Sequence, residues 1–275
     1  MKRLIFSCLL LVLITNTAFT QDSLNIKGKI VFSNDDVVFH QIDEHTWVGS
    51  GHEMWHESLF LIEGNNKAIL IDAGTNIKDL DKIVSSITKK PVVLVATHVH
   101  PDHTGPSINS FPEIYINPGD ADSVPMFMSN YKGVVKYLKD REIIDLGNRQ
   151  LEVVYTPGHT KGSTTFIDKN AGYGFSGDSF GTGLLLLTVD FSTFIASCEK
   201  ICSLMEGNKI KYLYPGHFNE NNMETLNKIK DMLALSQNVL SGNIKGNDNP
   251  DNTFGLKLAV EGNGYRIIYN ESAIK

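Results

Sequence analysis

Four side chains that can bind a metal ion stand within the six-residue run His98-Val99-His100-Pro101-Asp102-His103. Imidazole nitrogens and carboxylate oxygens are ligands that zinc takes in proteins. On an extended segment, residues two apart point to the same side, so His98 and His100 can bind one ion together. Asp102 and His103 then face a second ion. The run therefore predicts a metal site rather than a solvated, histidine-rich loop.

One such run cannot complete two coordination shells, so other loops must supply further ligands. The sequence offers three more residues at places where a strand-like segment ends, two of them in Pro-Gly turns. Taken singly, each is more often a cap or a hydrogen-bonding group than a ligand. Together with the histidine run they predict a site for two metal ions. They are His159 in Pro157-Gly158-His159, Asp178 in Gly177-Asp178-Ser179 and His217 in Pro215-Gly216-His217.

A competing motif, His52-Glu53-Met54-Trp55-His56, formally fits the H-E-x-x-H pattern of zinc proteases. That pattern requires a helix that turns both histidines to one face. Gly49 and Gly51 precede the motif and a strand-like segment follows at once, so we expect a loop between two strands. Trp55 in this loop is a candidate substrate contact near the metal site, with a packing role as the alternative.

The chain around these motifs alternates strand-like runs with amphipathic helices. The apolar run 92–96 is typical of a strand covered on both faces, and it leads straight into the histidine run. Sheets flanked by helices in two similar halves predict an α/β fold, a four-layer αβ/βα sandwich built by one compact domain over residues 21–275. Helices are predicted at about 76–88, from 191 onward and at about 223–240. Strands are predicted at 29–32, 37–42, 46–49, 58–62, 68–72, 92–96, 151–155, 164–167, 173–175, 211–214, 254–260 and 265–269.

These motifs, taken in order, resemble those of the metallo-β-lactamase fold superfamily over about Ile30 to His217. Asp72, in Leu70-Ile71-Asp72-Ala73-Gly74, matches the first motif of the family, a carboxylate that orients the histidine run. That role is physically sensible because a ligating imidazole needs an acceptor on its other nitrogen. Zinc is the expected metal, and iron and manganese stay open as alternatives. The resemblance implies two zinc-binding groups bridged by Asp178: His98, His100 and His159 in the first, and Asp102, His103 and His217 in the second.

Two zinc ions about 3.5–4 Å apart can share a hydroxide, because binding to zinc lowers the pKa of water to about 7. We expect this hydroxide to attack the carbonyl of an ester, thioester, lactone or amide in a small-molecule substrate. Asp102 or a metal-bound water then returns a proton to the leaving group.

The same resemblance carries alternatives. Asp178 stands where one group of β-lactamases has a cysteine ligand, and the other subclasses usually lack a bridging aspartate, so class B β-lactamase activity is kept only as an alternative. Glyoxalase II uses the aspartate, but its helical C-terminal domain differs from the short, β-rich tail after Gly242. A di-iron oxidoreductase of this fold normally replaces the second histidine by an acidic residue and has a flavin domain.

Two apolar features are interpreted mainly as core. Cys198 and Cys202 fall on the apolar stripe of the helix that begins at Phe191, which predicts packed thiols rather than metal ligands. A disulfide within one helical turn is the strained alternative. The run 183–188, Gly-Leu-Leu-Leu-Leu-Thr, is predicted to be core, with the lining of an acyl-chain pocket as the alternative.

The N-terminus predicts export. Met1-Lys2-Arg3 is followed by an apolar run, Leu4 to Ile14, that is too short to span a bilayer as a helix. We expect a signal peptide at residues 1–20 with cleavage after Thr20, a periplasmic or secreted protein, and no stable membrane insertion afterwards. A lipoprotein anchored at Cys8 and a buried N-terminal element are the alternatives.

The charge of the chain argues against nucleic acid as a partner. Its formal net charge of -6 becomes -6 - 2 = -8 once Lys2 and Arg3 are removed with the signal. An acidic surface repels phosphate backbones.

Overall fold

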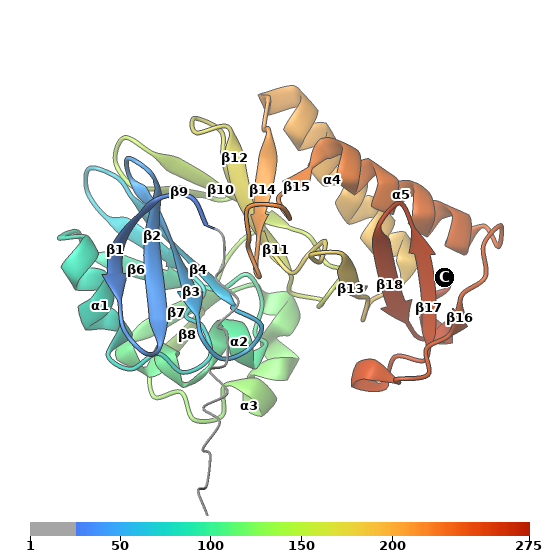
Figure 1. The fold of residues 1–275 in the computed structure, drawn as a ribbon, viewed down its shortest axis with the longest axis horizontal. Helices are drawn as coiled ribbons and strands as arrows, with labels where there is room; N and C mark the ends of the chain where they lie inside the picture. Colours follow the sequence, from blue (N-terminus) through green and yellow to red (C-terminus); the bar gives the residue numbers. More distant parts are fainter. Residues whose placement is uncertain (1–25) are drawn as a thin grey trace, which may run out of the picture.

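Two β-sheets form the centre of the structure, a computed structural model that describes residues 26–275 (Figure 1). The predicted signal at residues 1–20, its cleavage site after Thr20 and the alternative anchor Cys8 lie outside the described residues. Within the described residues the first sheet has eight strands in the order β1-β2-β3-β4-β5-β6-β7-β8. They are β1 (Lys29–Ser33), β2 (Val37–Asp43), β3 (Thr46–Gly51), β4 (Ser58–Glu63), β5 (Ala68–Ile71), β6 (Val92–Val95), β7 (Glu113–Ile116) and β8 (Val134–Tyr137).

The second sheet has the order β15-β14-β12-β11-β10-β9. Strands β1 to β5 form an antiparallel meander, whereas β5, β6, β7 and β8 are parallel. In the second sheet only β12 and β14 pair in parallel. Its strands are β9 (Ile143–Asp145), β10 (Gln150–Tyr155), β11 (Thr164–Asp168), β12 (Tyr173–Gly177), β14 (Tyr212–Pro215) and β15 (Glu224–Thr225).

Alternation of side chains along the strands separates the core into layers. In β4, Phe60 lies between the two sheets, whereas Leu59 faces the outer layer that contains α1 (Leu80–Ile87). In β10, Val153 lies between the sheets, and Val154 faces the outer layer of α4 (Phe191–Asn208) and α5 (Leu226–Leu240). The layers are therefore helix, sheet, sheet, helix, which confirms the predicted four-layer αβ/βα sandwich.

A third, smaller sheet packs beside α5, in the order β13-β18-β17-β16. Figure 1 shows it at the far side of α4 and α5 from the first sheet. Two of its strands, at 258–262 and 265–269, form a hairpin joined by Asn263 and Gly264, which both have positive φ. Its strands are β13 (Leu184–Leu186), β16 (Asn247–Asp248), β17 (Leu258–Gly262) and β18 (Tyr265–Tyr269).

Several predicted boundaries are wrong for local reasons. The first helix begins at Leu80 rather than near residue 76, because Asp79 before it has a left-handed backbone (φ 53°, ψ 38°). The last long helix begins at Leu226, since β15 pairs with β14 and the Thr225 side chain caps the helix. β17 begins at Leu258 rather than at 254, because Phe254 lies in a turn with φ 54°.

Other short elements have no counterpart in the sequence interpretation. The strands β7, β8 and β9 have only three or four residues each, too few for a clear periodicity. The structure also has two single-turn helices, α2 (Pro101–Thr104) and α3 (Val124–Phe127).

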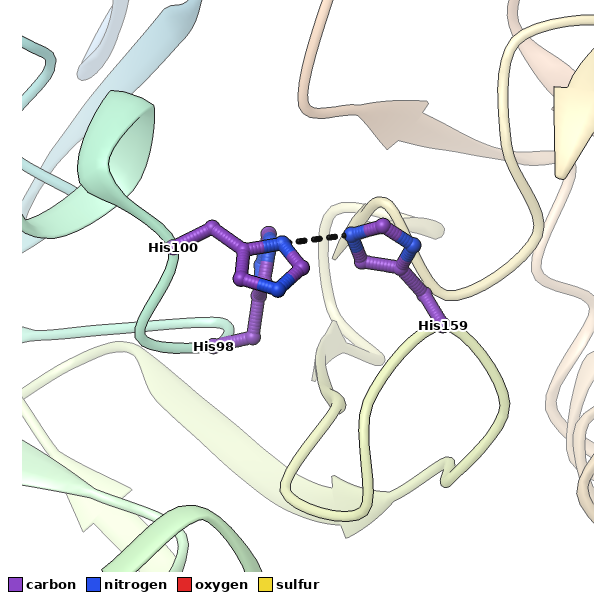
Figure 2. A group of neighbouring side chains, drawn as sticks. All are labelled: His98, His100 and His159. Atoms are coloured by element: carbon purple, nitrogen blue, oxygen red, sulfur yellow. Dashed lines mark hydrogen bonds between the residues drawn. The ribbon is translucent and has the colours of Figure 1, made fainter. Parts of the chain in front are cut away.

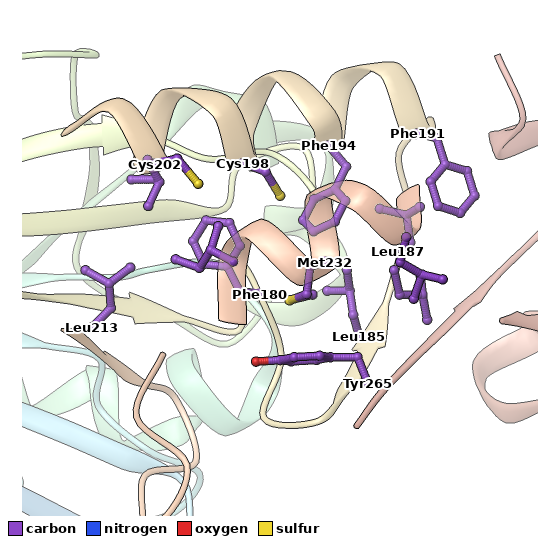
Figure 3. Close-up of a cluster of buried hydrophobic side chains, with 14 of the residues drawn as sticks. Phe180, Leu185, Leu187, Phe191, Phe194, Cys198, Cys202, Leu213, Met232 and Tyr265 are labelled. Atoms are coloured by element: carbon purple, nitrogen blue, oxygen red, sulfur yellow. The ribbon is translucent and has the colours of Figure 1, made fainter. Parts of the chain in front are cut away.

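The two cysteines of α4 confirm the core interpretation. Cys198 and Cys202 are free thiols and both are buried. Figure 3 shows them among apolar side chains between α4 and α5. Burial raises the pKa of the Cys198 thiol well above its usual value, which keeps it neutral.

Within residues 26–275, none of the helices combines the length and the apolar character that crossing a bilayer requires.

Gly177 is a position where the fold requires glycine. It ends β12 with φ 53°, and an added Cβ would lie 2.3 Å from Oγ1 of Thr97. We expect Gly177→Ala to lower the free energy of unfolding by about 2 kcal/mol or more, since left-handed strain and a clash add up. Gly207→Ala in α4 is the matched control. Nothing lies within 4 Å of its added Cβ, and the substitution should raise stability by about 0.5–1 kcal/mol. Urea unfolding measures both, and equal midpoints for Gly177→Ala and the unmodified protein would contradict the prediction.

Candidate metal centre

The chain topology brings the predicted ligands to one edge of the sandwich. In the first sheet the parallel strands β5 and β6 end there, followed by Asp72 and by the histidine run. In the second sheet β10, β12 and β14 run in one direction, so the loops that follow them also meet at one edge. These loops carry His159, Asp178 and His217.

Three imidazoles form a first group, with one nitrogen from each within 4.8 Å of the others: His98, His100 and His159. Nδ1 of His100 lies 3.1 Å from Nε2 of His98 and 2.8 Å from Nε2 of His159 (Figure 2). His98 and His159 are buried, and His100 is half-buried. His100 has an extended backbone (φ -66°, ψ 155°), as the sequence interpretation requires for adjacent ligands.

Four side chains form a second group with the same spacing: Asp102, His103, Asp178 and His217. Asp102 and His103 lie in α2, because the chain turns helical directly after His100, and their side chains join the second group. Nε2 of His217 lies 3.3 Å from Oδ2 of Asp102 and 3.5 Å from Oδ2 of Asp178. The same Asp178 oxygen lies 3.8 Å from Nε2 of His159 in the first group. Asp178 thus stands between the two groups.

Two orphaned atoms show that the donor set fits metal ions. Nε2 of His103 and Oδ1 of Asp178 are buried without a hydrogen-bond partner, although they lie only 3.6 Å apart. Leaving a buried polar atom unpaired costs about 1–3 kcal/mol. A bound cation removes that cost, and mixed imidazole and carboxylate donors suit zinc, iron or manganese. The structure therefore has two metal-binding groups of histidine and aspartate, consistent with a dinuclear centre.

Carboxylate and carbonyl oxygens orient two of the imidazoles through the ring nitrogen that faces away from the metal-binding group. Asp72 accepts hydrogen bonds from the backbone N–H of Thr97 (2.7 Å) and from its hydroxyl (2.8 Å). Its Oδ2 lies 2.8 Å from Nδ1 of His103, which leaves Nε2 of His103 facing the second group. Asp72 thus contacts the histidine run at His103 and the residue before the run, Thr97. On the other side, Nδ1 of His159 lies 3.1 Å from the carbonyl oxygen of Leu186, so Nε2 of His159 faces the first group.

The surroundings of the first group favour the neutral form of its three imidazoles. Burial lowers the pKa of His98 well below its usual value and also lowers the pKa of His159. Burial, with the neighbouring His159, lowers the pKa of His100 to about 4. Neutral imidazoles are the form that binds a metal ion.

The second group is built from opposite charges. Burial disfavours the charged imidazole of His103, but the carboxylates around it outweigh burial and raise its pKa well above the usual value. Burial likewise opposes charge on His217, and Asp178 with Asp102 raises its pKa to about 10. Burial disfavours the Asp178 carboxylate, but His217 and His103 hold its pKa well below the usual value.

The H-E-x-x-H-like segment forms a loop, as predicted. Trp55 and His56 have φ of 52° and 57°, which no α-helix contains, and neither His52 nor His56 joins a metal-binding group. The Trp55 side chain is 66% exposed. Its carbonyl oxygen lies 3.3 Å from Nδ1 of His217, so the loop borders the second group.

Three contributors were missed from the sequence. The carbonyl of Leu186 orients His159, and the Phe127 ring lies edge-on to His100 at a centroid distance of 5.3 Å. A main-chain carbonyl leaves no signal in a sequence. Asp120 is the third. The sequence signal that could have identified it is its position in an Asn-Pro-Gly-Asp turn after a strand-like segment.

Comparisons with known proteins identify the family. The family model described as Metallo-beta-lactamase superfamily matches residues 55–217. The chain is 27% identical over 235 residues to acyl-coenzyme A thioesterase MBLAC2 of Gallus gallus, covering 67% of this chain and 84% of that protein. It is 28% identical over 202 residues to a probable hydroxyacylglutathione hydrolase of Schizosaccharomyces pombe, covering 69% and 73%.

Solved structures share the fold. A metallo-beta-lactamase from Pontibacter korlensis superimposes with a TM-score of 0.58 at 20% identity, over 74% of this chain and all of that one (100%). One from Erythrobacter litoralis superimposes with a TM-score of 0.57 at 17% identity, over 76% and 99%. Fold, site and relatives together define a metal-dependent hydrolase. The chain belongs to the metallo-β-lactamase superfamily.

Metal binding at the second group should release protons. The pKa of His217, raised by Asp178 and Asp102 against burial to about 10, keeps this imidazole protonated at neutral pH, whereas a ligand must be deprotonated. We therefore expect the affinity for the second ion to rise as the pH increases from about 6 to about 9, roughly tenfold per pH unit for each proton released. Titration calorimetry in two buffers with different ionisation enthalpies counts the protons. An affinity that does not change over this range would contradict the prediction.

Proposed function

We propose that the protein is a dinuclear zinc hydrolase that cleaves a small thioester by attack of a hydroxide on its carbonyl. In this proposal His98, His100 and His159 would hold the first ion, Asp102, His103 and His217 would hold the second, and Asp178, which lies between the groups, would contact both. The observation that carries it is the position of Asp178 Oδ2, 3.8 Å from Nε2 of His159 and 3.5 Å from Nε2 of His217.

The protein's own residues prepare the reaction. Zinc ions in such a centre supply a nucleophile by lowering the pKa of water to about 7, and they polarise the carbonyl. Asp72 and the Leu186 carbonyl keep the imidazoles aligned, so little reorganisation is needed during the reaction. Burial opposes ionisation of Asp102, but His103 and His217 lower its pKa, so Asp102 is an ionised carboxylate that can take up a proton and pass it to the leaving group.

A thioester suits this site better than an amide or a β-lactam. A thiol has a pKa of about 8.5, so a thiolate leaves without a strong general acid. Both relatives support this choice, since one is named an acyl-coenzyme A thioesterase and the other a probable hydroxyacylglutathione hydrolase, and both of these substrates are thioesters.

Exposed apolar side chains support an acyl group as the part of the substrate next to the carbonyl. The run 183–188 is divided between two roles: Leu185 and Leu187 are in the core, as predicted, whereas Leu184 is 46% exposed. Leu184 lies in β13, the strand whose Leu186 carbonyl holds His159. The exposed Trp55 borders the second group. We propose that Trp55 and Leu184 contact the acyl chain.

We also propose that the chain is exported, with residues 1–20 removed and residues 21–275 active in the periplasm or outside the cell. The basis is the charged and apolar N-terminus. The intact mass of protein recovered from the native host measures the cleavage site, and a mass that includes Met1 or a lipid on Cys8 would contradict cleavage after Thr20.

The substrate prediction is tested by loading the protein with zinc and comparing turnover of an acyl-coenzyme A, lactoylglutathione, a homoserine lactone, a penem and an aryl ester. We expect the highest kcat/KM for a thioester. Visible absorption from iron in the protein as isolated would favour the di-iron alternative, and preferred turnover of the penem by the zinc-loaded protein would favour the β-lactamase alternative.

Asp178→Ala should lower kcat/KM by about 100-fold or more, because losing several kcal/mol of charge stabilisation corresponds to that factor. It should also reduce the bound zinc below two ions per chain. Glu199→Ala, which removes an exposed carboxylate of α4, is the control and should change neither value. Full zinc content together with full activity in Asp178→Ala would overturn the bridged centre.

A further inference from the structure

We propose that Asp120 is a positioning residue of the metal centre, whose buried carboxylate ties the loop of His98 and His100 to the loop of His159. The inference rests on the proposed function, because it assumes that these three histidines bind a metal ion. Asp120 follows β7 in the turn Pro118–Ser123, and it is 2% exposed.

The contacts of the carboxylate reach both loops. Oδ2 of Asp120 accepts hydrogen bonds from the backbone N–H of Val99 (3.2 Å) and from the hydroxyl of Thr160 (3.0 Å). Oδ1 accepts a hydrogen bond from the backbone N–H of Gly162 (2.7 Å). Val99 lies between His98 and His100, and Thr160 directly follows His159. One side chain therefore sets the distance between two loops that come from different sheets.

Glycines on both sides of the contact allow this approach. A Cβ at Gly162 would lie 2.3 Å from Cγ of Asp120. A Cβ at Gly119 would lie 2.5 Å from the carbonyl oxygen of Lys161. Because real Cβ contacts are not that short, the two turns meet backbone to backbone only with glycine at these places. Nearby, the amide of Asn117 donates to Thr164 Oγ1, which strengthens the same junction.

A carboxylate serves this place better than a neutral side chain. Its two oxygens accept from three donors, whereas an amide offers one acceptor and would turn its NH₂ group toward at least one N–H or O–H donor. A buried carboxylate is costly unless its hydrogen bonds are made, so the three donors and the carboxylate hold each other in place.

The second group does not depend on this link. His103 is oriented by Asp72, and within residues 26–275 no hydrogen bond of the Asp120 carboxylate reaches a residue of the second group. Loss of the Asp120 carboxylate should therefore weaken the binding of one metal ion and leave the binding of the other unchanged.

The test uses Asp120→Asn and the matched control Asp168→Asn. Asp168 is 0% exposed, accepts a hydrogen bond from the backbone N–H of Ala171 (2.8 Å) and forms an ion pair with Arg149. Asp168 is the last residue of β11. The first residue of that strand, Thr164, lies near the metal centre, since its backbone N–H donates a hydrogen bond to the carbonyl oxygen of Thr97, beside the histidine run. Each variant removes one buried carboxylate. Zinc binding is measured by competition with a chelator, and the thermal unfolding of each metal-free variant is recorded alongside.

We expect the unmodified protein to bind two zinc ions, and Asp120→Asn to bind one of them 10- to 100-fold more weakly, as is typical when support behind a ligand is lost. Asp168→Asn should lower the unfolding temperature but leave both affinities unchanged. If the unmodified protein binds fewer than two ions, the proposed function itself fails. If it binds two and Asp120→Asn retains both at full affinity, or loses both equally, the positioning role is wrong.

Thr160→Ala and Thr160→Ser decide the question should Asp120→Asn not fold. Thr160→Ala removes one donor to the carboxylate, and Thr160→Ser keeps the hydroxyl. Weaker binding of one zinc ion in the alanine variant, restored in the serine variant, supports the link. Equal affinities in both variants and the unmodified protein overturn it.

Discussion

The crowding of seven buried or half-buried ionisable side chains in one small space is the constraint on which the rest of the structure depends. Five imidazoles and two carboxylates meet at one edge of the sandwich, and two of their polar atoms have no partner among the described residues. Repulsion and desolvation make such a cluster unfavourable by itself, and bound cations turn the same cluster into a favourable arrangement. The metal ions are therefore expected to be part of the folded state as well as of the chemistry.

The side chains of such a cluster must be kept in their orientations by neighbouring residues. The fold places these neighbours in short connections at strand ends. Asp72 follows β5 and contacts His103, while Gly177 at the end of β12 leaves space for Thr97, which bonds to Asp72. The sheets are rigid because they are packed on both faces. A loop of only a few residues between such strands therefore holds its side chains in well-defined positions. Asp120 extends the same principle to the contact between the two halves.

The third sheet connects the C-terminal part of the chain to the chemistry. β18 pairs with β13, and the Leu186 carbonyl of β13 orients His159. The segment after Gly242 is thus linked to the first metal-binding group through strand β13. β13 also exposes Leu184, the side chain that we propose contacts the acyl chain of the substrate.

The sequence by itself determined the types and the order of the candidate metal-binding residues, and the layered fold. Four metal-binding side chains in six residues, and an apolar strand leading into them, are local patterns, so His98 to His103 and the helix from Phe191 could be recognised without coordinates. Short-range patterns could not predict the strands β7 to β9 or the left-handed Asp79, because these depend on neighbours distant in sequence. The family resemblance already implied that Asp178 lies between the two groups, and the structure gave the distances. Only the tertiary structure brought Asp120 and the Leu186 carbonyl to loops of other strands. Hydrogen bonds between distant segments form only once the two sheets face each other.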